Sequence, residues 1–363
     1  MVDSYSNEGI KSKERSLRGS GERYVLRNID MKVPHDLDNF LSVGENKEEL
    51  FLLIQRSVEN QSLGDKTIMF CYLNRCVQVS AGGVIDLPGL SSEYEEADFM
   101  FVAYSVIEEG SIMIRSPSGD TDIIVMLISH LDKISATVYV DNGTGNNRKV
   151  LHLNTCTLSL EIRNAIIGLH AISGNDYVSS FFRKGKKTFW RIARKNVAFL
   201  EALTKLGQTY EVAKDVEETI EKFICAIYGK SKLTDVNLAR AAIFWDRYNK
   251  QKKIIDLCML PPCKENLKFH IRRSNYIAYI MRHAHMLKPQ LQHFSLHGWN
   301  GTTAEAEWMT TLAPQDIADV LIASEEANVK VDDGFDELYD PEDEDMQYVG
   351  ECDDDDVELE DFS

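Results

Sequence analysis

Two closely spaced acidic pairs are the residues of this sequence best suited to chemistry. One residue separates Glu96 from Asp98, one separates Asp120 from Asp122, and a fifth acid, Asp176, follows further along the chain. Carboxylates that share a small volume repel one another unless cations neutralise them. All-carboxylate sites suit Mg²⁺ or Mn²⁺, and two such ions can activate water against a phosphodiester. These five acids therefore predict a catalytic site with two Mg²⁺ or Mn²⁺ ions.

Each acidic pair also has a purely structural interpretation. An Asp-x-Asp sequence at the end of a strand is often a turn or a helix N-cap. Glutamate and aspartate in the first turn of a helix interact favourably with the helix dipole. A metal site is favoured over these alternatives because three acidic elements fall within one α/β region.

The elements around the acids are predicted to alternate between helix and strand. Ser92-Glu-Tyr-Glu95 has the pattern of a capping box, and the apolar segment from Glu96 predicts a buried helix. Strands are predicted at 111–115, 137–140 and 150–153, with helices at 120–130 and, capped by Thr157, at 157–172. This alternation is typical of an α/β fold with a mainly parallel central sheet flanked by helices. The carboxyl ends of parallel strands meet at one edge, which would bring the acids together.

The flanking segments have different compositions. Residues 1–25 are polar and predict a mobile arm, in which Asp3 is a weak further candidate for a metal ligand. A helix is predicted at 47–60, and strands at 67–72 and 76–80. Beyond about residue 190 the clear elements are all helical, with loops at 261–262 and 293–303.

A cluster of cations surrounds a glycine between residues 183 and 195. Glycine turns at helix N-termini expose backbone N–H groups to phosphate, and nearby cations add salt-dependent attraction to a nucleic-acid backbone. The alternative is a solvated basic face. Phe181, Phe182, Phe189 and Trp190 are predicted to lie in the core rather than to stack on bases. The predicted nucleic-acid-binding residues are Arg183, Lys184, Gly185, Lys186, Lys187 and Arg191.

The net charge of −18 arises almost entirely from the end of the chain. Residues 331–363 contain 17 acids and no lysine or arginine, which leaves 41 acids and 40 bases before them. Such a segment predicts a disordered acidic tail that could bind a basic protein partner or compete with nucleic acid. The nearly neutral body does not exclude a nucleic-acid partner.

The cysteines and the N-terminus predict an intracellular protein that does not enter a membrane. The seven cysteines are scattered without a CxxC motif, no apolar run could span a bilayer, and no signal peptide is recognised. Cys258 and Cys263, with His270, His283 and His285, offer zinc-type donors at a spacing that fits a structural zinc site poorly. Burial as packing groups is the favoured interpretation of these residues.

The acidic series and the segment from Gly168 to Trp190 resemble the PIN-like, flap-endonuclease superfamily of structure-specific 5′-nucleases, which includes the XPG and asteroid-type groups. The whole chain also resembles transposon-associated animal proteins with this domain, and this likeness includes Leu260-Pro-Pro-Cys-Lys and His297-Gly-Trp. The resemblance implies a metal-dependent nuclease that cleaves DNA or RNA, with a helix–hairpin–helix element at about 168–195, and it favours a nuclear location. It also implies a PIN-like domain over 1–200, a helical region over 201–330 and the tail from 331.

One departure from the family pattern concerns the first strand. No segment before Asp3 corresponds to that strand and its aspartate, so either the sequence is truncated at its N-terminus or the protein never had this ligand. The second case would remove a metal ligand and a central strand. This favours, as an alternative, a catalytically inactive nucleic-acid-binding relative derived from a mobile element. A protein-interaction scaffold built on the C-terminal helices and the tail is a third hypothesis.

Overall fold

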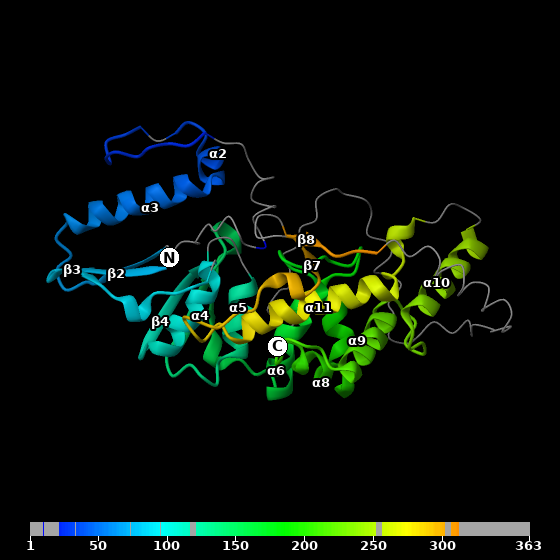
Figure 1. Cartoon of the computed structure of the whole chain (residues 1–363). Coiled ribbons are helices and arrows are strands. Elements are labelled where there is room, and N and C mark those ends of the chain that lie inside the picture. Colours follow the sequence, from blue (N-terminus) through cyan, green and yellow to red (C-terminus); the bar gives the residue numbers. More distant parts are fainter. Residues whose placement is uncertain are drawn as a thin grey trace.

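The computed structural model describes residues 10, 22–32, 34–72, 74–94, 96–116, 121–251, 256–301 and 306–311. These residues form a mixed α/β structure, about half helical, with small sheets (Figure 1). Several predictions lie outside the described residues: the weak ligand Asp3 with most of the N-terminal arm, Glu95 of the capping box, the site residue Asp120 and the acidic tail.

The first part of the structure is a helix on an antiparallel meander. α2 (Leu37–Ser42) and α3 (Gly44–Glu59) precede β1 (Ile68–Tyr72), β2 (Arg75–Ser80) and β3 (Gly83–Asp86), which lie with α3 at one end of the molecule (Figure 1). Phe51 of α3 packs edge-on against Phe70 and Tyr72 of β1, at ring distances of 5.4 and 5.3 Å. The helix predicted at 47–60 and the strands at 67–72 and 76–80 are confirmed, whereas α2 and β3 were not predicted.

Part of the predicted N-terminal arm is attached to α3. The buried Asn46 side chain accepts a hydrogen bond from the Tyr24 N–H at 2.8 Å and donates one to the Glu22 carbonyl at 3.0 Å. Residues 22–25 are thereby fixed to the helix.

The central region contains one parallel strand pair and one antiparallel pair. α4 (Ala97–Ile107) leads to β4 (Ser111–Ser116), α5 (Thr121–Ser129) and β5 (Thr137–Asn142), and β4 and β5 are parallel. β6 (Lys149–His152) is antiparallel to β5. The predicted mainly parallel sheet is therefore wrong for the described strands. The connection from β5 to β6 is too short for a crossover, so the chain can only return as a hairpin.

Two predicted helix caps are also wrong. α4 begins one residue after Glu96, which is its N-cap without a side-chain cap bond, while the Ser92 hydroxyl accepts the Tyr94 N–H at 3.2 Å. α6 (Leu160–Ser173) is capped by Ser159, whose hydroxyl accepts the Ile162 N–H, and Thr157 lies before it. Serine and threonine near a helix start compete for the same role, and the local turn decides between them.

The remainder of the described chain is mostly helical, as predicted. α7 (Lys186–Ala193), α8 (Val197–Lys205), α9 (Lys214–Ile227), α10 (Val236–Gln251) and α11 (Lys264–Arg282) follow α6. A short antiparallel pair, β7 (Trp299–Asn300) and β8 (Glu307–Trp308), is the exception to the prediction of helices alone. Buried apolar side chains of α5, α6, α8, α9 and α11 form one continuous core that holds the candidate site in place.

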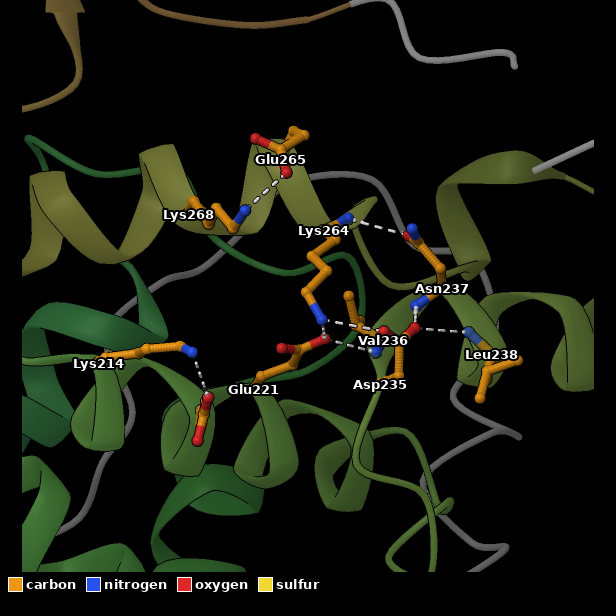
Figure 2. Close-up of polar contacts among 10 residues, drawn as sticks. Lys214, Glu221, Asp235, Val236, Asn237, Leu238, Lys264, Glu265 and Lys268 are labelled. Carbon is orange, nitrogen blue, oxygen red and sulfur yellow. Dashed lines mark hydrogen bonds and ion pairs between the residues drawn. The ribbon is translucent and has the colours of Figure 1, made fainter. Parts of the chain in front are cut away.

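A charged network joins α9, α10 and α11 (Figure 2). Nζ of Lys264 lies 3.0 Å from Oε1 of Glu221 and 2.9 Å from Oδ2 of Asp235. Burial opposes the charged ammonium, but the two carboxylates outweigh it and raise the pKa of Lys264. Glu221, with a side chain only 8% exposed, also accepts the N–H of Val236 at 2.9 Å. The network therefore fixes the start of α10 against α9 and α11.

Replacing Lys264 with methionine is expected to lower the free energy of unfolding by about 2 kcal/mol. Breaking a fully buried pair costs about 3–5 kcal/mol because one charge is left without its partner. The Lys264 side chain is 36% exposed, so water will compensate Glu221 in part. Urea unfolding measures the change. The matched control is Lys268→Met on the same helix, which breaks an i,i+3 pair with the 47% exposed Glu265 and should cost under about 0.5 kcal/mol. Equal losses would contradict the role given to Glu221.

Candidate acidic site and basic turn

Three of the predicted acidic residues lie together at the starts of two helices. Glu96 is the N-cap of α4, Asp98 lies in its first turn, and Asp122 lies in the first turn of α5. All three side chains are half-buried. The position at helix N-termini favours the ionised carboxylates.

A buried tyrosine connects these three acids. Tyr177, which follows α6, is 8% exposed, and its hydroxyl is bonded to Glu96. Burial raises the pKa of Tyr177 well above its ordinary value, and the nearby Glu96, Asp122 and Asp98 carboxylates add to the effect. The phenol therefore stays protonated and can donate to a carboxylate at neutral pH.

A buried histidine faces the second acidic pair. Nε2 of His170, on α6, lies 3.0 Å from Oδ1 of Asp122. This distance fits an ion pair, but the geometry does not meet the criteria for a hydrogen bond. The His170 side chain is 3% exposed. His170 and Tyr177 come from one helix and the turn after it, so this segment contacts acids of both α4 and α5. Neither residue was predicted, because His170 stands among apolar neighbours that indicate core and Tyr177 stands in a polar turn sequence that does not show where its ring points.

Asp176 lies on a tight turn next to Tyr177 and is exposed. The Asn175 side-chain oxygen accepts the N–H groups of Tyr177 at 2.9 Å and Val178 at 3.2 Å, which fixes the turn. Gly174 has φ +107°, and a Cβ there would lie 2.7 Å from the Ser180 Cα. The backbone of this turn therefore requires the glycine and the asparagine.

The donor set is suited to a hard cation but is incomplete within the described residues. Carboxylate oxygens are the ligands that Mg²⁺ and Mn²⁺ prefer. The described parts of the chain contain no group of three or more His, Cys, Asp or Glu side chains that could hold a metal ion. Asp120, which would add a carboxylate to that of Asp122, lies outside them.

A further buried aspartate, Asp141, lies at the end of β5. Its side chain is 4% exposed, and its two oxygens accept from Nε and Nη2 of Arg148, both at 2.7 Å. Arg115 lies 3.1 Å away on β4. The Arg148 hydrogen bonds lower the pKa of Asp141, with help from the charge of Arg115. Because two guanidinium groups already balance this charge, Asp141 stabilises the strand ends rather than binding a cation.

The zinc-type donors are dispersed. Cys258 is exposed and Cys263 is buried. Nε2 of His270 donates to the Ile172 carbonyl at 2.8 Å, and Nδ1 accepts from the Ser179 hydroxyl at 3.2 Å. His270 thus joins α11 to the end of α6, which agrees with the structural interpretation.

The predicted basic cluster lies on the second of two successive tight turns and on the helix that follows it. Asn175 pairs with Val178, Phe181 pairs with Lys184, and Gly185 is the N-cap of α7. Lys184 places its ammonium 5.7 Å from the centre of the Tyr228 ring, and the Lys187 side chain is exposed. The remaining predicted contacts, all at least partly accessible, are Arg183, Lys186 and Arg191.

Three of the four aromatic residues of this segment are core residues, as predicted. Phe189 is fully buried, and Phe181 and Trp190 are 6% and 7% exposed. The prediction is wrong for Phe182, which is 41% exposed. Phe181 and Phe182 are neighbours in a tight turn, so only one of them can face the core.

No protein family, curated protein or solved structure matches this chain. None of the helices in the described ranges is both long and apolar enough to cross a membrane.

Proposed function

We propose that this chain is a divalent-metal-dependent nuclease with a PIN-like, flap-endonuclease-type fold, acting on phosphodiesters of DNA or RNA. The observation that supports it best is that the buried Tyr177 hydroxyl is bonded to Glu96, while the charges of Asp122 and Asp98 also act on this hydroxyl. The helix N-termini and the phenol favour ionised carboxylates here, and such carboxylates are the ligands that Mg²⁺ and Mn²⁺ prefer.

The residues present have defined roles in this proposal. Glu96, Asp98 and Asp122, with Asp120 and Asp176, would hold two Mg²⁺ or Mn²⁺ ions. Such ions activate water and neutralise charge on the phosphate. Tyr177 and His170 orient Glu96 and Asp122, because a fixed second partner restricts the rotation of a carboxylate. The basic turn attracts the nucleic-acid backbone.

Nucleic-acid binding without hydrolysis is the second candidate function. It is favoured by the absence of a complete metal-ligand group among the described residues and by the exposed position of Asp176. The basic turn does not depend on the acidic site, so binding would persist in an inactive protein.

Cleavage assays test the first proposal and separate it from the second. Labelled flap, nicked and single-stranded DNA and RNA are incubated with the full chain and Mg²⁺, Mn²⁺ or EDTA. We expect metal-dependent cleavage that falls more than about 100-fold in Asp122→Asn and about 10- to 100-fold in Tyr177→Phe, as for residues that support metal ligands. The exposed Asp65→Asn is the control and should match wild type. Cleavage that persists in Asp122→Asn would overturn the site. Salt-dependent binding with no cleavage would establish the second function.

A further inference from the structure

The turn from Phe181 to Lys184 presents an aromatic ring on a rigid support. The Lys184 N–H donates to the Phe181 carbonyl at 3.0 Å, which closes the turn. Phe181 points inward and packs against the rings of Phe189 and His270, at 5.4 and 4.8 Å. Phe182 stands at the corner, 41% exposed. The buried neighbour anchors the turn and thereby fixes the exposed ring.

Arg183, next in the turn, has an unusual backbone conformation. Its φ of +55° lies in the left-handed region, which disfavours residues with a Cβ and which glycine or asparagine usually occupies in turns. This conformation places the guanidinium 5.3 Å from the centre of the Phe182 ring. Residues held in such conformations occur preferentially at functional sites. The strained turn thus combines a cation and an aromatic ring in one exposed unit.

The charge around Phe182 selects for a polyanion. Four of the five residues that follow it are cationic, namely Arg183, Lys184, Lys186 and Lys187, and none is acidic. The exposed acid of the preceding turn is Asp176. An aromatic ring among cations fits a ligand that has both phosphates and flat π faces, and nucleic acid has both.

We propose that Phe182 and Arg183 form a stacking contact for an unpaired base, with the phosphates on either side bound by the neighbouring lysines. The inference rests on the nucleic-acid binding proposed above but not on cleavage. A duplex hides the faces of its bases, so the contact favours single-stranded segments or junctions with a free base. Stacking of one base on an aromatic ring contributes enough to change the dissociation constant about 5- to 150-fold.

Fluorescence anisotropy in EDTA tests this contact with three labelled probes: single-stranded DNA, the same strand with abasic sites, and duplex DNA. Phe182→Ala should weaken binding of the single strand about 5- to 150-fold and leave the abasic and duplex probes unchanged. Phe182→Tyr, which keeps a ring, should restore the single-strand affinity. Val197→Ala, at a 70% exposed apolar position nearby in the chain, should change nothing.

The outcomes separate this inference from the proposed function. The double variant Lys184→Ala/Lys187→Ala should lose affinity for all three probes, whereas Phe182→Ala should lose affinity for the intact single strand alone. This pair of results supports the stacking contact and the proposed nucleic-acid binding. Two results would overturn the stacking contact and leave nucleic-acid binding intact. In the first, Phe182→Ala changes the binding of none of the probes; in the second, it weakens binding of the abasic and the normal strand equally. Failure of the wild-type protein to bind any of these probes overturns the stacking contact together with the binding of DNA.

Discussion

An alanine at position 207 is expected to lower the free energy of unfolding by about 4 kcal/mol. Gly207 has φ +77°, a left-handed conformation that costs a residue with a Cβ about 1–2 kcal/mol. A Cβ here would also lie 2.4 Å from the Ala278 carbonyl carbon and 2.5 Å from the Tyr279 nitrogen. Both are backbone atoms of α11, and overpacking of this kind costs about 1–3 kcal/mol.

The loop around Gly207 cannot move away from this clash at low cost. The Gly207 N–H donates to the buried Asn275 side chain at 2.8 Å, and the Asn275 amide donates in turn to the Thr209 carbonyl at 2.9 Å. Relief of the clash would break these bonds and leave a buried amide without partners, which itself costs about 1–3 kcal/mol.

Gly110 provides the matched control. Its φ is +79°, nearly that of Gly207, but a Cβ there would meet nothing within 4 Å. Gly110→Ala should therefore cost only the conformational part, about 1–2 kcal/mol. Urea unfolding gives the loss in free energy of unfolding for each variant. The difference between the two losses measures the cost of the close contact between the loop after α8 and α11. Equal losses in the two variants would show that backbone conformation alone decides the effect at position 207.

The sequence predicted individual elements better than their arrangement. The apolar segment after Glu96 and the periodic pattern of 47–60 became α4 and α3, because burial of one face is a local property of the pattern. Strand direction is not local. β6 matches the predicted strand at 150–153, yet it runs antiparallel to β5 because its short connection allows no crossover.

The candidate site shows the same division. The spacing of the acids identified Glu96, Asp98 and Asp122 as part of one predicted group, and in the structure Glu96 is bonded to a buried phenol on which the charges of the other two also act. The partners of these acids could not be predicted, because only the fold defines which side chains face the apolar helix that holds His170 and the polar turn that holds Tyr177. For Phe182 the composition was misleading, since an aromatic among cations can face either the core or the solvent and the turn geometry alone decides which.

The second large expected effect is a loss of folding stability at acidic pH, and it arises at His270. Burial lowers the pKa of this imidazole from the ordinary value of 6.5 to about 4, and the charge of Arg273 acts in the same direction, while the bond to Ile172 opposes them. Below pH 6.5 the unfolded chain binds a proton that the folded state does not take up until about pH 4. Stability therefore falls as the pH drops through this range, by about 1.4 kcal/mol per unit and about 3 kcal/mol in total. Above pH 6.5 the contribution is constant.

The wild-type pH dependence includes other histidines, so the difference between two proteins is the useful quantity. Burial also lowers the pKa of His285 to about 4, and that contribution is common to wild type and variants. His270→Gln removes one titrating group while retaining a donor for the Ile172 carbonyl, so its stability should fall less steeply between pH 6.5 and 4. Ser179→Ala loses one hydrogen bond, worth about 1 kcal/mol, but keeps the imidazole and should retain the wild-type slope. Parallel slopes for wild type and His270→Gln would mean that the folded protein accepts the proton at His270, and that the junction between α11 and α6 opens before the rest of the chain unfolds.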